Sequence, residues 1–193
     1  MSRPIQEKAL KPEIDLLVDF VNTRDVEEET DAIAAPAQLR TWIAEHAGEY
    51  LPELETGDLP RVLELREALR ALMLANNGVP AGERELEALR EAAERSRYRL
   101  AFDAGGKLSL APARADLAGF ESRLLLALER LQCEDAWPRL KACTDEGCQW
   151  AFYDATRNRS RTWCSMDVCG NREKTRRYRQ RKGAGTRRQP QDP

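Results

Sequence analysis

The 193-residue sequence lacks any apolar run long enough to cross a lipid bilayer. Its longest runs, such as Leu124–Leu128, contain five residues, whereas a membrane-spanning helix needs about 20. The first residues also lack an apolar stretch of signal-peptide length. We therefore expect no membrane partner and a cytoplasmic location.

The sequence has one histidine and none of the residue sets on which most catalytic sites depend. That histidine, His46, falls in a predicted surface helix, and there is no Ser/His/Asp set, phosphate-binding glycine loop or open metal site. Carboxylates are numerous, but they are scattered over predicted helices as on solvated surfaces. The sequence therefore predicts a protein that is not an enzyme.

The formal net charge is only -2, yet charge is distributed unevenly along the chain. Residues 139–193 contain 14 Lys and Arg against 6 Asp and Glu, a net charge of +8. Residues 1–138 contain 17 basic and 27 acidic residues, a net charge of -10. The small total therefore does not exclude nucleic-acid binding, because the basic residues are concentrated in one part of the chain.

Apolar residues at helical spacing predict a mainly α-helical fold with a small β-hairpin for the acidic part. With 41% hydrophobic and 33% charged residues, the chain has the composition of a globular protein of one or two domains. The predicted helices cover 14–21, 37–46, 58–75, 80–96 and 117–131. Between the last two, alternating apolar residues around Gly105-Gly106 predict the hairpin, over 98–110.

All five cysteines lie in the last third of the chain. Cys143 and Cys148 form one pair and Cys164 and Cys169 another, with four residues inside each pair and 15 between them. Two such pairs can supply the four thiolates of a tetrahedral zinc site, which has no open position and is structural. The alternatives are reversible disulfides or ordinary buried cysteines. Cys133 has no partner nearby in the sequence. We therefore expect Cys133 to act as a small apolar residue at the end of a helix.

The residues around the cysteine pairs predict a treble-clef-like zinc finger, made of a knuckle, a β-hairpin and a basic helix. Gln149–Tyr153 alternates like a short strand, 155–160 is a polar turn, and Arg161–Trp163 is the expected partner strand. The segment 172–182 has no internal glycine or proline and predicts the helix. The expected parts are a helical domain over 1–136, the zinc finger over 137–182 and a disordered tail over 183–193.

The predicted C-terminal helix is strongly basic. It has seven Lys and Arg among the 11 residues 172–182, and three more arginines precede Trp163. Such a cluster neutralises phosphates, and Asn or Arg at the helix start can contact bases. The candidate DNA-binding residues are Arg157, Arg159, Arg161, Asn171, Arg172, Lys174, Arg176, Arg177, Arg179 and Arg181. One alternative is that the helix only presents a solvated charged face, which can also dock on the acidic domain of the same chain. The others are an RNA-binding module and a zinc-stapled protein-interaction module.

Two segments resemble known families. Residues 143–154 and 157–166, followed by Cys169-Gly-Asn-Arg172, resemble the CGNR zinc finger, which is named after that tetrapeptide. The segment Leu17-Val-Asp-Phe-Val-Asn-Thr23 resembles the start of the ABATE domain of bacterial stress-induced transcription regulators. The resemblance implies a bacterial regulator that binds double-stranded DNA and one structural Zn²⁺, with the metal held by Cys143, Cys148, Cys164 and Cys169.

The resemblance also suggests that the helical domain senses a small-molecule effector. Asp19, Asn22 and Thr23 are polar residues at the end of an apolar helix and are the candidates for an effector pocket. Alternatively, they cap the helix and bond to a neighbouring loop. The opposite charges of the two parts suggest that the acidic domain partly masks the finger until DNA or a ligand competes. The sequence allows homo-oligomers but does not determine the oligomeric state.

Overall fold

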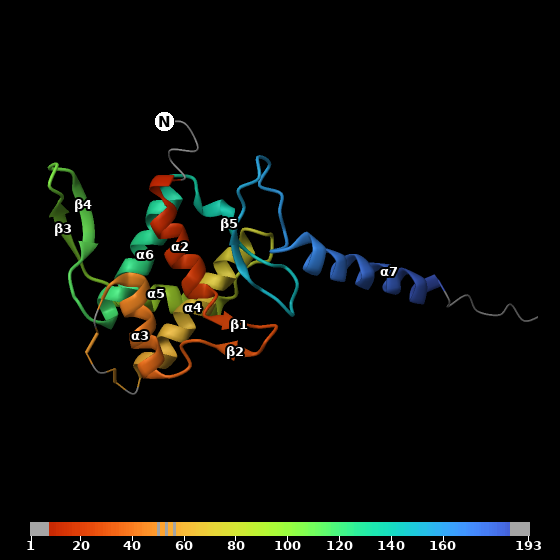
Figure 1. Cartoon of the computed structure of the whole chain (residues 1–193), viewed down its shortest axis with the longest axis horizontal. Coiled ribbons are helices and arrows are strands. Elements are labelled where there is room, and N and C mark those ends of the chain that lie inside the picture. Colours follow the sequence, from red (N-terminus) through yellow and green to blue (C-terminus); the bar gives the residue numbers. More distant parts are fainter. Residues whose placement is uncertain (1–7, 50, 53, 56, 186–193) are drawn as a thin grey trace, which may run out of the picture.

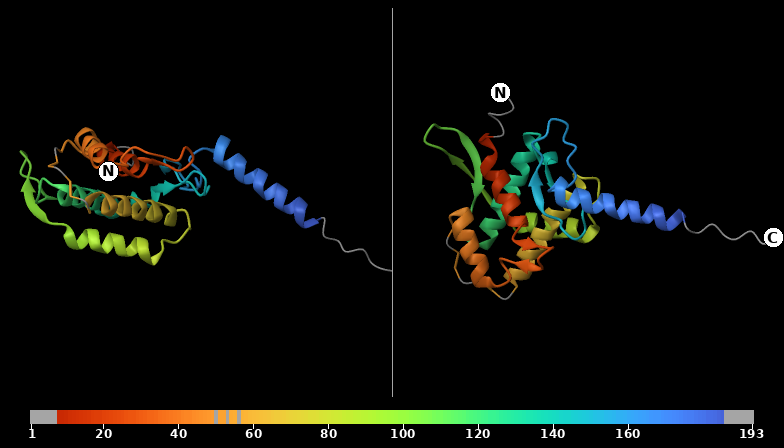
Figure 2. Two further views of the ribbon diagram at one scale, coloured as in Figure 1. Left: turned by 90° about the horizontal axis from the view of Figure 1, so that it is seen from below. Right: turned by 45° about the vertical axis from the view of Figure 1, so that its right-hand side comes forward.

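In the computed structural model, which describes residues 8–49, 51–52, 54–55 and 57–185, helices form the body of the protein. These helices are α2 (Lys11–Val21), α3 (Pro36–Ala47), α4 (Asp58–Ala75), α5 (Glu83–Arg95) and α6 (Leu117–Cys133). α2 packs on α4 and α6, and α5 covers the opposite side of the same two helices (Figure 1; Figure 2). The mainly α-helical fold is confirmed. Among the described residues, every helix is either too short or too polar to cross a lipid bilayer.

The centre of the body is an aromatic cluster that α2, α3 and α6 share. The ring of Phe20 lies 5.7 Å from that of Trp42 and 5.6 Å from that of Phe120, measured between ring centroids. Aromatic pairs at this distance add roughly 0.5–1.5 kcal/mol to the stabilisation from burial alone. Phe20 and Phe120 have no exposed surface. The helical spacing of the apolar residues therefore identified the buried faces of these helices correctly.

Helix α5 begins later than the sequence predicts. The prediction starts at Pro80, whereas the helix starts at Glu83 with Gly82 as an N-cap in extended conformation. The first hydrogen bond of the helix runs from the Leu86 N–H to the Gly82 carbonyl (3.1 Å). The helical turns therefore start directly after this extended residue, three residues later than Pro80.

Two small hairpins belong to the body. As the sequence predicts, a hairpin joins α5 to α6: β3 (Tyr98–Phe102) pairs antiparallel with β4 (Leu108–Pro112). Between α2 and α3, β1 (Arg24–Asp25) pairs antiparallel with β2 (Thr30–Asp31). The turn between β1 and β2 contains the exposed acidic residues Glu27–Glu29.

The C-terminal third begins with a 3-10 turn, Trp137–Arg139, followed by the hairpin of β5 (Leu140–Ala142) and β6 (Ala151–Tyr153). The sequence prediction that Arg161–Trp163 is the partner of this strand was wrong, because β5 takes that place. All three residues of β5 are buried, whereas Arg161–Trp163 remain partly exposed. Pairing with β5 therefore joins β6 to the buried core, to which Leu140 and Ala142 of β5 belong.

Helix α7 (Asn171–Gly185) projects from the body (Figure 1; Figure 2). A one-turn π-helix, Met166–Gly170, leads into it. The helix continues three residues past Lys182, where the sequence prediction ended it, although two of these residues are glycines. The remaining part of the predicted disordered tail, residues 186–193, lies outside the described residues.

The body and the β5–β6 hairpin share one hydrophobic core. Leu140, Ala142 and Ala151 belong to the same buried cluster as the helices, whereas the cysteines form a small cluster of their own. The buried guanidinium of Arg70 adds polar contacts across this boundary. It donates to the carbonyls of Val21 (2.7 Å) and Gln149 (2.8 Å). The body and the finger are therefore expected to unfold together.

Replacing Arg70 by methionine should lower the free energy of unfolding by about 3–5 kcal/mol. The substitution leaves the carbonyls of Val21 and Gln149 without their donor at a buried boundary, while the partly exposed Glu67 keeps its ion pair with Arg66. Urea unfolding followed by circular dichroism measures the change. The control is Arg84→Met, which removes an exposed ion pair and should cost less than about 1 kcal/mol. Equal losses in the two variants would contradict the expectation.

Candidate metal centre and nucleic-acid interface

Four cysteine side chains meet at one point of the C-terminal third. The Sγ atoms of Cys143, Cys148, Cys164 and Cys169 all lie within 4.8 Å of one another. Cys164 is 3.5 Å from Cys148 and 3.6 Å from Cys169, far longer than the roughly 2.05 Å of a disulfide. Sulfurs about 2.3 Å from a tetrahedral zinc ion are about 3.8 Å apart. The cluster therefore fits one zinc ion with four thiolate ligands.

A tight turn after β5 positions the first pair. The Cys143 N–H donates to the Trp150 carbonyl (2.9 Å), and the Cys148 N–H donates to the Asp145 carbonyl (2.9 Å). Gln149 has a φ of 52°, so the chain reverses directly after Cys148 and returns as β6. This turn brings both thiols to the same side and forms the predicted knuckle.

The second pair connects the basic loop to α7. Cys164 ends the loop, and Cys169 lies in the π-turn directly before α7. Gly170 lies directly after this ligand, and a Cβ there would lie 2.5 Å from the Met166 sulfur, so a larger residue would displace this flexible side chain. A metal bound here therefore fixes the point at which α7 starts.

Burial holds protons on the thiols until a metal replaces them. Burial and the neighbouring Cys164 thiol raise the pKa of Cys148 to about 12. Burial and the adjacent thiols also raise the pKa of Cys169. Zinc binds thiolates, so its binding must displace these protons. With four sulfur ligands, the bound ion has no open position and would cross-link the knuckle to α7 rather than activate a substrate.

A buried ion pair, which the sequence reasoning missed, organises the loop between β6 and Cys164. The Lys141 ammonium lies 3.0 Å from Asp154 and also donates to the carbonyls of Arg159 (2.6 Å) and Arg161 (3.0 Å). Burial alone would raise the pKa of Asp154, but hydrogen bonds from Thr156 and Lys141 outweigh it and hold the pKa at about 2. The available signal was a lysine inside an apolar strand, because a buried cation needs an acidic partner.

The three arginines predicted on this loop have different surroundings. The guanidinium of Arg161 lies 4.6 Å from the ring centroid of Phe152 and donates to backbone carbonyls at the end of the loop. Arg159 forms an ion pair with Asp135 (2.7 Å). Arg157 is exposed. Arg161 therefore braces the metal loop, whereas Arg157 faces solvent.

Helix α7 carries cations on all sides. Over 172–182 it has seven Lys and Arg and one carboxylate, Glu173. Glu173 forms ion pairs with both Arg176 and Arg177. Within the part of the chain that the structure describes, no ion pair forms at Lys174, Arg179 or Arg181. A large positive charge therefore remains uncompensated along this helix.

The first two residues of α7 contact their own chain. The Asn171 side-chain amide donates to the Asp167 carbonyl (2.9 Å). Arg172 lies 2.8 Å from Glu27, in the turn between β1 and β2, and 3.5 Å from Asp145. The Cys-Gly-Asn-Arg motif thus contributes a metal ligand, a close backbone approach and two internal contacts. Any base contact by Asn171 or Arg172 competes with these internal partners.

Asparagine side chains of the body hold the knuckle. Asn22 accepts a hydrogen bond from the Ala151 N–H (2.7 Å) and donates to the Ala151 carbonyl (3.0 Å), as a neighbouring strand would. Asn77 donates to the Ala142 carbonyl (2.8 Å), and Asn76 donates to two further carbonyls before β5 and in it. The sequence predicts a helix that ends at residue 75, directly before Asn76 and Asn77, and indicates no contact of these asparagines with the finger. No local pattern distinguishes a helix end from such a contact.

The three residues predicted for an effector pocket have mostly internal partners. Asn22 pairs with β6, and the buried Thr23 hydroxyl donates to the Phe20 carbonyl (2.8 Å). Asp19 is on the exposed side of α2, where partial burial and the nearby Asp15 raise its pKa. Asn22 and Thr23 therefore form hydrogen bonds to neighbouring segments, as the alternative to an effector pocket expects. A sensing role for the three residues stays a prediction.

Elemental analysis should give about one zinc ion per chain, and Cys164→Ser should remove most of it because one of four ligands is lost. The control is Cys133→Ser. Cys133 lies exposed at the end of α6, where its thiol contacts Glu129, and this variant should retain zinc and melting temperature. Full zinc occupancy in Cys164→Ser, or a metal-free wild type that melts normally, would exclude the ligand assignment.

Comparison with known families covers both parts of the chain. Residues 139–182, which include all four clustered cysteines, match the CGNR zinc finger. Residues 15–136 match the ABATE family, described as "Putative stress-induced transcription regulator". A search of curated proteins found no match. The body of helices followed by a four-cysteine zinc site therefore identifies the chain as a member of the ABATE family that carries a C-terminal CGNR zinc finger.

Proposed function

We propose that this protein binds double-stranded DNA through α7 and the basic loop before Cys164. The observation that carries the proposal is a helix that projects from the body with seven cations and one carboxylate over 172–182 (Figure 2). Phosphates release their counterions when they meet such a surface, which gives strong, salt-dependent binding. The description of the family as a transcription regulator supports this partner. The protein would act in the cytoplasm, where bacterial DNA lies.

The zinc site would give this helix a defined direction. Cys169 directly precedes α7, so a bound ion ties the helix to the knuckle, and Asn22 and Asn77 tie the knuckle to the body. Contacts to phosphate would supply most of the affinity and little sequence information. Base contacts are then left to a few residues near the helix start. The protein would therefore bind any duplex weakly and its target more tightly.

Arg179→Glu should weaken binding to duplex DNA by about tenfold or more and reduce the salt slope by about 1. Arg179 forms no ion pair among the described residues, so its charge is available to a phosphate. Fluorescence anisotropy at several salt concentrations measures both quantities. For the wild type, log Kd should rise with log salt by about 0.9 for each phosphate neutralised.

The control for this measurement is Arg90→Glu, which makes the same charge change on α5. It should leave duplex affinity nearly unchanged. Equal effects of the two substitutions would mean that only the total charge matters and would contradict a site on α7. Stronger competition by duplex or single-stranded RNA would instead favour an RNA-binding module. Stronger competition by polyglutamate than by duplex DNA would favour an acidic protein partner.

We also propose that the acidic turn between β1 and β2 restrains α7. Glu27 in this turn holds Arg172 at 2.8 Å, and a phosphate that contacts Arg172 must displace it. Both side chains are 40–46% exposed, so the pair is worth only about 0.2–1 kcal/mol. The proposed restraint is therefore small, and DNA can overcome it. The Glu27–Arg172 ion pair is thus the contact through which the acidic domain would partly mask the finger.

Glu27→Gln should strengthen duplex binding by about 1.4- to fivefold at low salt, because it removes the shorter of the two ion pairs of Arg172. The matched control is Glu28→Gln, which makes the same charge change at the neighbouring exposed position. A titration of both variants with one duplex measures the difference. Equal strengthening in both would reduce the effect to general charge. Weaker binding by Glu27→Gln would show that the pair orients Arg172 for DNA instead of restraining it.

A further inference from the structure

The β3–β4 hairpin exposes a continuous apolar face. Residues directly opposite each other in an antiparallel pair share a face, and Leu100 is opposite Leu110 while Phe102 is opposite Leu108. Tyr98 lies on the same face at the start of β3. We call these five residues the hairpin strip: Tyr98, Leu100, Phe102, Leu108 and Leu110. Their side chains are between 41% and 71% exposed.

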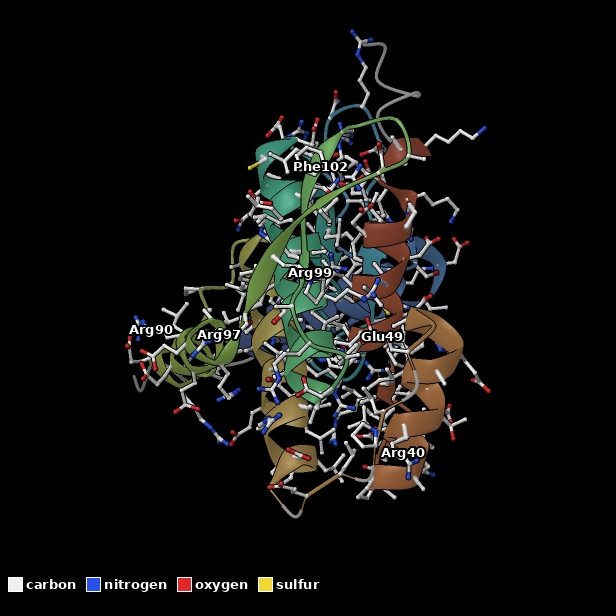
Figure 3. All side chains as sticks on the ribbon, turned by 90° about the vertical axis from the view of Figure 1, so that its left-hand side faces the viewer. Arg40, Glu49, Arg90, Arg97, Arg99 and Phe102 are labelled. Atoms are coloured by element: carbon white, nitrogen blue, oxygen red, sulfur yellow. The ribbon has the colours of Figure 1, made fainter. Side chains whose placement is uncertain are left out.

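The body does not use the hairpin strip. The hairpin packs against α6, and Ala101 and Ala111 of its opposite face are partly buried. Figure 3 shows the hairpin lying across the front of α6, with Phe102 near its tip. α7 lies at the other end of the molecule (Figure 1). The hairpin strip is therefore separate from the proposed DNA-binding surface and needs another explanation.

The chemistry of the hairpin strip restricts what can cover it. None of its five side chains carries a charge, and the Tyr98 hydroxyl is the only polar group among them, so the hairpin strip is poorly suited to phosphate or to a charged peptide. A fully exposed side chain of this size presents roughly 200 Å², so the five together expose on the order of 550 Å². That value is near the upper end for the largest apolar patch on a monomer. A partner for this face must itself be apolar and of similar size.

We propose that the hairpin strip is a homodimer interface in which two copies of this chain pack face to face. A second copy supplies an uncharged surface of matching size, and a two-fold axis lets each hairpin strip cover the other. The two copies together would bury on the order of 1,000 Å², which is the lower limit for a specific dimer. The two hairpins would then stack about 10 Å apart, as sheets do in a sandwich. The dimer should therefore be weak and depend on concentration.

Analytical ultracentrifugation of the zinc-loaded full chain tests the proposal without DNA. The mass should rise from the 21.9 kDa of one chain towards twice that value as concentration increases. Leu100→Asp should raise the dimer Kd by at least about tenfold, because a carboxylate must then be desolvated at the centre of the interface. The control is Val79→Asp, which places the same charge at an exposed apolar residue outside the hairpin strip and should leave Kd unchanged.

Circular dichroism and zinc content check that each variant is folded, and Phe102→Asp provides an independent substitution at the most exposed position of the hairpin strip. A wild type that stays monomeric at all concentrations overturns the proposal. So does a dimer that persists in both folded hairpin variants, since it must form elsewhere. A monomer that sediments with neutral phosphatidylcholine vesicles also overturns it and assigns the hairpin strip to a lipid surface. Loss of DNA binding without loss of the dimer bears only on the proposed function.

Discussion

Hydrogen bonds from side chains of the helical body to the backbone of the zinc knuckle determine where everything after residue 139 lies. Asn22 occupies the place of a neighbouring strand beside Ala151, and Arg70 reaches the carbonyl of Gln149 from the buried side. Unpaired backbone groups at a buried strand would be costly, so these contacts both satisfy the hairpin and fix its position. Cys143 and Cys148 lie in the turn of this hairpin, and the basic loop, the other two thiols and α7 follow it along the chain, so all of them take their positions from it.

The finger distributes its charges between structure and surface. Lys141 and Asp154 are buried together and hold the loop through backbone carbonyls, so this cation is unavailable to a partner. Arg161 is similarly engaged with Phe152. The charges along α7 lie in solvent, where ion pairs contribute little and are easily exchanged for phosphate. Burial, rather than the number of cations, therefore separates those that build the finger from those that can bind.

Local patterns were sufficient for the helices and the metal ligands. A helix buries residues three and four apart, so the apolar spacing that includes Phe20 and Phe120 was readable without any contact being known. The four thiols were readable for a similar reason, since each pair is close along the chain and zinc needs four of them. The strand predicted over Gln149–Tyr153 forms over Ala151–Tyr153, but the choice of its partner was wrong. The strand pairs with the segment before it, β5, whose three residues are all buried, and the sequence analysis did not predict a strand there.

The sequence by itself thus determined the helical body, the zinc finger and the segregation of positive charge, because each depends on neighbours along the chain. Only the tertiary structure decided the roles of polar residues with distant partners. Asn22 and Ala151 are 129 positions apart, and no spacing rule connects an asparagine at a helix end to that strand. The exposure of the hairpin strip was equally hidden, because an alternating strand reads the same whether its apolar face is covered or not.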